Sequence, residues 1–77
     1  MKTPRETIEK IRATLADAAG PIASFVVKKQ IKDMGYTEDD FPSEKLPELI
    51  NRVVENAIYN PEMKEDVRRK LRKVIGG

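Results

Sequence analysis

The sequence contains no cysteine, no histidine and no tryptophan, and its 77 residues include only four glycines. Without cysteine there are no disulfides or thiolate ligands, and without histidine the chain lacks imidazole metal ligands and the commonest general base. A domain of this size buries only about 60 to 65% of its unfolded surface, so its core is marginal. Small domains often add disulfides, metals or oligomerisation, and of these devices oligomerisation is the one that remains.

Long apolar runs and an excess of one charge are also missing. No run approaches the roughly 18 apolar residues of a membrane span, and Met1-Lys2-Thr3-Pro4 leads into an amphipathic segment with no signal-peptide core. Fifteen basic residues face thirteen acidic ones, so the high isoelectric point reflects a small excess and not a polycationic surface. We therefore expect one cytoplasmic domain, residues 1–77, that does not contact a membrane.

Apolar periodicity and helix-start signals mark four helical segments. Thr3-Pro4-Arg5-Glu6 matches a capping box, in which the Thr3 side chain accepts from the Glu6 backbone N–H and Pro4 takes the first helical position. The third segment carries the cleanest apolar stripe, and Ser43 is its expected cap. The predicted helices span residues 4–19, 21–34, 44–59 and 61–75.

Two junctions place a proline at the helix boundary with no loop. Gly20-Pro21 ends the first helix and opens the second, because glycine suits a left-handed cap and proline starts a helix well but cannot continue one. Asn60-Pro61 repeats the device, with Asn60 as the cap. We expect the first two helices to meet at a corner and not as an antiparallel hairpin. This pattern predicts an all-α fold, a small orthogonal four-helix bundle of two proline-cornered pairs.

The connection before the third helix is acidic. Gly35 is the expected cap of the second helix, Thr37 starts a capped turn, and Tyr36 and Phe41 form an apolar plug. Carboxylates in a flexible loop suit a hard cation, but the spacing does not fit an EF-hand and acids are favoured at helix starts anyway. We expect no metal and favour a head-to-tail or intersubunit electrostatic contact with the basic helices two and four. The carboxylates concerned are Glu38, Asp39, Asp40 and Glu44.

The helix at 21–34 is the segment whose apolar residues do not fit one face. One stripe holds Ile22, Phe25 and Val26, and a second, centred roughly 140° away, holds Val27, Ile31 and Met34. A surface helix normally has one stripe a little over about 100° wide, so this helix needs cover on two sides. We expect it to be the central helix, wrapped by the rest of the chain or covered by a second copy.

The end of the last helix carries a cluster of basic side chains. Pairs from Glu65 to Arg69 and from Asp66 to Lys70 have the favourable order, which leaves Arg68, Arg72 and Lys73 uncompensated. A solvated face is the more frequent explanation of such a cluster, and a surface for nucleic acid or another anion is the alternative. Lys28 and Lys32 extend this surface only if the fold brings the second and fourth helices together.

The sequence offers little to support catalysis. Ser43 is interpreted as a cap, Ser24 has no histidine to activate it, and phosphate-loop and dinucleotide fingerprints are absent. We therefore expect no enzymatic activity and no cofactor.

Four short motifs lie between residues 20 and 57: Gly20-Pro21-Ile22-Ala23, the FVVKKQ run at 25–30, Gly35 and Leu46-Pro47-Glu48-Leu49. They resemble a small prokaryotic, notably archaeal, helical domain of unknown function that often lies beside signalling or regulatory modules. The resemblance covers residues 20–57. It implies a helical fold and a regulatory or assembly context, with no catalytic or ligand-binding residues.

These observations favour a regulatory protein–protein interaction module that acts as a homodimer. After a second copy of the chain, the next partner we consider is another protein. The alternative function is nucleic-acid binding through the basic end of the last helix. The residues expected in self-association and the core are Phe25, Val26, Val27, Ile31 and Met34, and those expected on an anion-binding surface are Lys28, Lys32, Arg68, Arg72 and Lys73.

Overall fold

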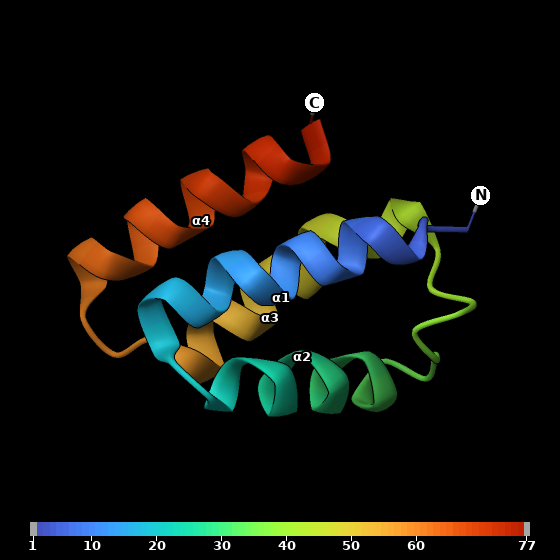
Figure 1. Ribbon diagram of the computed structural model, residues 1–77, viewed down its shortest axis with the longest axis horizontal. Helices are drawn as coiled ribbons and strands as arrows, with labels where there is room; N and C mark the ends of the chain where they lie inside the picture. Colours follow the sequence, from blue (N-terminus) through green and yellow to red (C-terminus); the bar gives the residue numbers. More distant parts are fainter. Residues whose placement is uncertain (1, 77) are drawn as a thin grey trace.

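The computed structural model describes residues 2–76, and over this range the chain forms four α-helices and one short 3-10 helix (Figure 1). The all-α class and the existence of all four predicted helices are confirmed. The elements are α1 (Arg5–Ala19), α2 (Ile22–Asp33), η1 (Ser43–Lys45), α3 (Leu46–Ala57) and α4 (Pro61–Gly76).

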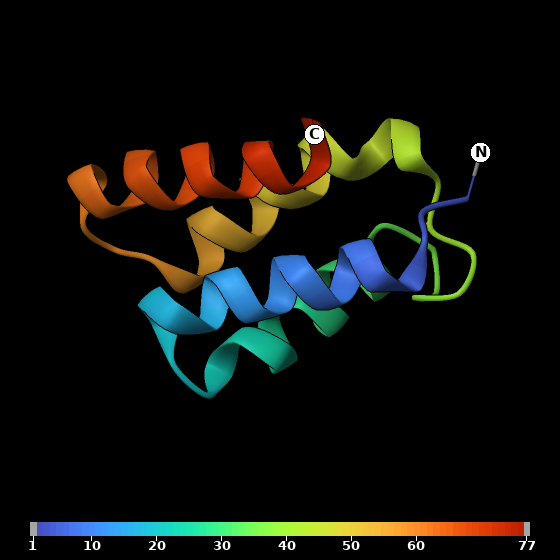
Figure 2. The same ribbon diagram turned by 45° about the horizontal axis from the view of Figure 1, so that its top comes forward.

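Each helix packs against two others: α1 against α2 and α4, and α3 against α2 and α4. Successive helices run in alternating directions along the long axis, and α2 and α4 lie on opposite sides of the bundle (Figures 1 and 2). The core is therefore shared by all four helices, and α2 covers one side of it. Both proline-marked junctions lie at the same end of the molecule.

The junction between α1 and α2 is a tighter reversal than the open corner expected from the missing loop. Gly20 has a φ of 74°, in the region that favours glycine, and its N–H donates to the Ala16 carbonyl over 2.8 Å. Pro21 already has helical angles, φ −60° and ψ −21°. This single glycine turns the chain back, so α2 runs alongside α1 and packs against it.

The apolar stripes identified from periodicity form the core. In the second stripe of α2, Val27 is 0% and Ile31 1% exposed, and Met34 is partly buried against the core. The α3 stripe is buried along its whole length, which confirms its predicted inward face. The other buried apolar side chains of these two stripes and their neighbours are Ile8, Ile11, Leu15, Leu46, Leu49, Ile50, Val53, Val54, Ala57, Ile58, Val67 and Leu71.

The starts of α1 and α3 differ from the prediction. No side chain caps α1, which begins at Arg5 after Pro4, so the capping box at Thr3 is wrong. The Thr3 N–H instead donates to the Phe41 carbonyl over 2.7 Å, and its hydroxyl is buried without a partner among the described residues. Ser43 likewise makes no cap, because a 3-10 turn precedes α3.

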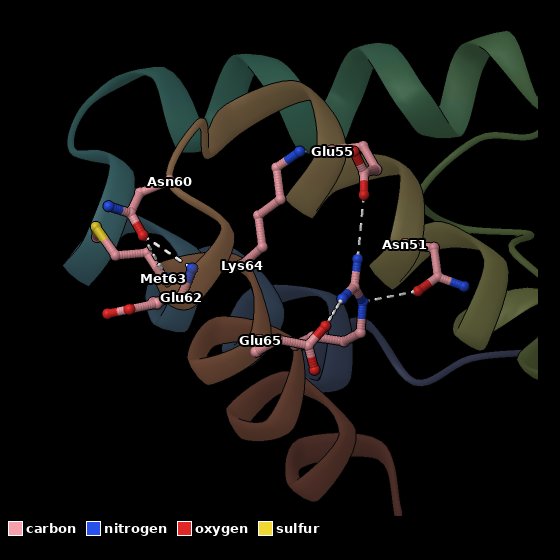
Figure 3. A network of polar contacts seen from close by, with 8 residues as sticks. Asn51, Glu55, Asn60, Glu62, Met63, Lys64 and Glu65 are labelled. Carbon is pink, nitrogen blue, oxygen red and sulfur yellow. Dashed lines mark hydrogen bonds and ion pairs between the residues drawn. The ribbon is translucent and has the colours of Figure 1, made fainter.

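The end of α3 comes earlier than expected. Ile58 is extended, with φ −119° and ψ 130°, and its side chain is buried. The helix therefore stops at Ala57 instead of 59, and Tyr59 is left 90% exposed. Asn60 caps α4 as predicted, since its Oδ1 accepts from the N–H groups of Glu62 and Met63 over 2.8 and 3.1 Å (Figure 3).

The end of α2 follows the predicted glycine signal. Gly35 has a φ of 91°, its N–H donates to the Lys32 carbonyl, and the Tyr36 N–H donates to the Ile31 carbonyl. This pair of bonds is the Schellman arrangement, which satisfies carbonyls that the helix end leaves free. Tyr36 then meets buried Phe41 edge-on, with ring centroids 5.5 Å apart, so the predicted apolar plug is confirmed.

A capped turn begins at Thr37, also as predicted. The Asp40 carboxylate accepts from the Thr37 backbone N–H over 2.6 Å and from its hydroxyl over 2.8 Å. These two hydrogen bonds lower the pKa of Asp40 below its ordinary value of 3.8.

Replacing Val27 with Asp places an unpaired charge in the core. We expect the Val27→Asp variant to lose about 3 kcal/mol or more of unfolding free energy, or to be unfolded, in urea denaturation followed by circular dichroism. Ser24→Asp, on the exposed side of the same helix, is the matched control and should change stability by less than about 0.5 kcal/mol. Equal midpoints for Val27→Asp and wild type would contradict the burial of this stripe.

The lowered pKa of Asp40 gives a pH-dependent contribution to stability. The contribution is present above 3.8, the ordinary pKa of the carboxyl in the unfolded chain, and is lost as the pH falls through the lower folded-state value. In urea unfolding, Asp40→Asn should therefore be less stable than wild type at pH 6, and the difference should shrink as the pH is lowered below 3.8. A pH-independent difference would show that the carboxylate charge plays no part.

Candidate functional site

The outer face of α2 exposes two large apolar side chains. Phe25 is 68% exposed and Ile22 50% exposed, although both belong to the helix that also supplies Val27 to the core. Two large apolar side chains exposed next to each other indicate a contact site for a partner more strongly than single apolar residues scattered over a surface do. The chain itself therefore covers one stripe of α2 and leaves part of the other open.

Lysines follow the apolar pair along the same helix. Lys29 forms an ion pair with Asp33 at 3.3 Å, whereas Lys28 and Lys32 have no hydrogen bond or ion pair within residues 2–76. Lys28 and Lys32 border two surface depressions, one of about 410 Å³ beside Phe25 and one of about 370 Å³ beside Tyr36. We call the surface formed by Ile22, Phe25, Lys28, Lys29 and Lys32 the α2 face.

The structure separates the five residues that were expected in self-association and the core. Val26, Val27 and Ile31 are buried within one chain, and Met34 is partly buried against the core. Phe25 alone of the five is freely accessible. Ile22 joins it on the α2 face. Ile22 was missing from the five residues expected in self-association and the core, although it shares a helical stripe with Phe25, and this shared stripe was the signal for including it.

The basic residues of α4 are more fully paired than the sequence indicated. The Arg68 side chain is only 16% exposed, and its guanidinium group donates to Asn51 over 3.1 Å, Glu55 over 3.2 Å and Glu65 over 2.7 Å (Figure 3). The expectation that Arg68 is uncompensated is therefore wrong. Its bonds tie α4 to α3, which makes Arg68 part of the packing between these helices.

One further contact completes this network. Lys64 pairs with Glu55 at 2.8 Å, and this hydrogen bond, followed by the charge of Arg68, lowers the pKa of Glu55 (Figure 3). Glu65 is used by Arg68, so the expected pair between Glu65 and Arg69 does not form.

The free positive charge of α4 is confined to its last turns. Asp66 pairs with Lys70 at 3.1 Å and more loosely with Arg69 at 3.8 Å. Arg72 and Lys73 have no hydrogen bond or ion pair within residues 2–76. Because α2 and α4 lie on opposite sides of the bundle, Lys28 and Lys32 do not extend this basic cluster (Figures 1 and 2).

The acidic connection is closed onto α1 of the same chain. Asp39 pairs with Arg5 at 2.8 Å, and Glu38 pairs with Arg12, which also bonds Glu9. Burial lowers the pKa of Arg12, but the hydrogen bonds that Arg12 donates to Glu38 and Glu9, together with the charges of these carboxylates, outweigh that effect and raise it. Among residues 2–76 no three side chains of the metal-ligating types are grouped closely enough to hold an ion. Within the chain Glu38 and Asp39 therefore meet α1, and a contact of this loop with helices two and four of another copy stays a prediction.

The fold and this surface define a small all-α domain of four helices with one apolar and basic helix face. Residues 6–77 match the model of DUF8082, a domain of unknown function, and the chain belongs to this family. No curated protein and no solved structure matches the chain. The family match extends over α1 and α4, well beyond the 20–57 region of the resemblance. No helix among the described residues has the length and apolar character needed to cross a membrane.

The pairing of Arg68 predicts a clear difference between two arginines of α4. Arg68→Met removes three hydrogen bonds, two of which, to Asn51 and Glu55, join α4 to α3, so we expect a loss of about 1 to 2 kcal/mol in the free energy of unfolding by urea. Arg72→Met, the matched control without a partner in the described chain, should stay within about 0.5 kcal/mol of wild type. Equal effects of the two substitutions would contradict the structural role of Arg68.

Proposed function

We propose that this domain is a non-enzymatic protein–protein interaction module that acts as a homodimer through the α2 face. The observation that carries the proposal is the exposure of Phe25 and Ile22 on a helix whose other side is part of the core. A two-fold axis lets such a patch cover itself, because the same surface serves both subunits. A 77-residue chain without cysteine or histidine has oligomerisation as its remaining source of added stability.

The size of the α2 face sets the strength of this dimer. The 12 residues of α2 span about 18 Å at the usual rise per residue. A standard stable interface buries about 800 Å² on each partner, which is more than one short helix face provides. The dimer is therefore a reversible one, with a dissociation constant in the micromolar range or weaker. A cytoplasmic location and a regulatory context fit such an association and stay predictions from the sequence.

Nucleic-acid binding is the second candidate, and one observation favours it. Arg72 and Lys73 lack partners in the described chain, and the Arg69 side chain next to them is 68% exposed. With only two or three phosphate contacts, binding would be weak, would fall only moderately with salt because the salt dependence scales with the number of contacts, and would carry little sequence preference. A fluorescence titration with duplex DNA and with RNA at two salt concentrations tests this candidate, and no binding at the lower salt removes it.

Sedimentation velocity tests the homodimer directly. We expect wild type to show a concentration-dependent shift from monomer to dimer over the micromolar to millimolar range, and Phe25→Glu to remain monomeric, because a carboxylate on the α2 face opposes burial. Tyr59→Glu, which changes the most exposed aromatic side chain at a different site, is the matched control and should dimerise like wild type. A compact wild-type monomer at about 1 mM contradicts the proposal.

A further inference from the structure

Charge is distributed unevenly along the α2 face. Its apolar residues, Ile22 and Phe25, lie at the start of α2, and its lysines, Lys28, Lys29 and Lys32, lie in the second half. From this polarity, and on the basis of the proposed homodimer, we infer that two copies pair with their α2 helices antiparallel, about a two-fold axis close to Phe25.

A parallel arrangement is opposed by electrostatics. With the helices parallel, Lys28, Lys29 and Lys32 of one copy would each face the same lysine of the other, and like charges held directly opposite one another cost free energy. Only Lys29 has a neutralising partner, Asp33, on the same helix. The antiparallel arrangement moves the two lysine clusters to opposite ends of the contact.

The antiparallel arrangement also gives the lysine stems an apolar surface. With the axis next to Phe25, Lys29 of one copy lies opposite Ile22 of the other, and the two Lys29 residues are separated by about 10 Å along the helix direction. A lysine stem packs on apolar groups while its ammonium stays in water, and an ammonium near the face of Phe25 is attracted by the ring. The depression beside Phe25, which Lys29 also lines, is where the side chains of the second copy enter.

Lys32 then reaches past the α2 helix of the second copy to its α1–α2 junction. Asp17 lies there, in the last turn of α1. Within residues 2–76, Asp17 and Glu62 are the two side-chain carboxylates without a hydrogen bond or ion pair. The same turn of α1 contains no basic residue, so the negative end of its dipole is uncompensated. The free cation of one copy therefore meets the free anion of the other.

Engineered cysteines test the orientation, and the absence of natural cysteine removes any background. An equimolar mixture of Ile22→Cys and Lys29→Cys chains, oxidised under conditions where wild type is dimeric, should give mainly the mixed disulfide, because these positions face each other across the antiparallel contact. Lys32→Cys alone should cross-link poorly, since the two copies of this residue lie at opposite ends. Efficient Lys32→Cys cross-linking with little mixed product overturns the antiparallel arrangement and leaves the homodimer standing. A monomer in sedimentation overturns both.

A charge exchange tests the contact between Lys32 and Asp17. Lys32→Glu should weaken the dimer about fivefold, and adding Asp17→Lys in the same chain should restore the wild-type dissociation constant to within about twofold. Glu62→Lys added to Lys32→Glu is the matched control, since it reverses the other free carboxylate, and should not restore it. Rescue by Glu62→Lys equal to rescue by Asp17→Lys would show a general effect of net charge and overturn the assigned contact. Circular dichroism of each variant confirms that these exposed positions leave the fold intact.

Discussion

The burial of one stripe of α2 is the constraint on which the rest of the structure depends. Val27 and Ile31 lose all contact with water because α1 and α3 pack against α2, and α1 does so only because Gly20 turns the chain straight back at its end. In a domain of this size without cysteine, each such apolar contact is a large part of a small total stability. The position of α2 at the side of the core follows from this packing and leaves Ile22 and Phe25 of its other stripe outside.

Ion pairing within the chain decides which surfaces remain open to partners. Arg68 is used between α4 and α3, and Arg5 and Arg12 hold the acidic connection against α1. Charges that are paired within the chain in this way are already neutralised and are not open to a partner. The α2 face and the last turns of α4 carry Lys28, Lys32, Arg72 and Lys73, which have no carboxylate partner in the described chain. The two candidate functions rest on these surfaces.

Helix signals were reliable where they act through neighbouring backbone. Gly35 and Asn60 cap their helices as predicted, because a left-handed glycine and an asparagine side chain need only the adjacent turn to form their bonds. The side chains of Thr3 and Ser43 are equally suitable as helix caps, but neither of them caps its helix. The backbone of Thr3 is held by Phe41, a residue far away in the sequence, and its side chain is buried as a result.

Periodicity, proline and glycine in the sequence determined the four helices and the inward face of α3, since these depend on the spacing of side chains along a single rod. The tertiary structure alone decided which stripe of α2 is covered, where the α2 lysines lie relative to α4, and which arginines are paired. The physical reason is the separation in sequence of the residues that interact. A helix face is defined by residues three and four apart, whereas Arg68 contacts Asn51 and Glu55 only after two helices have packed together.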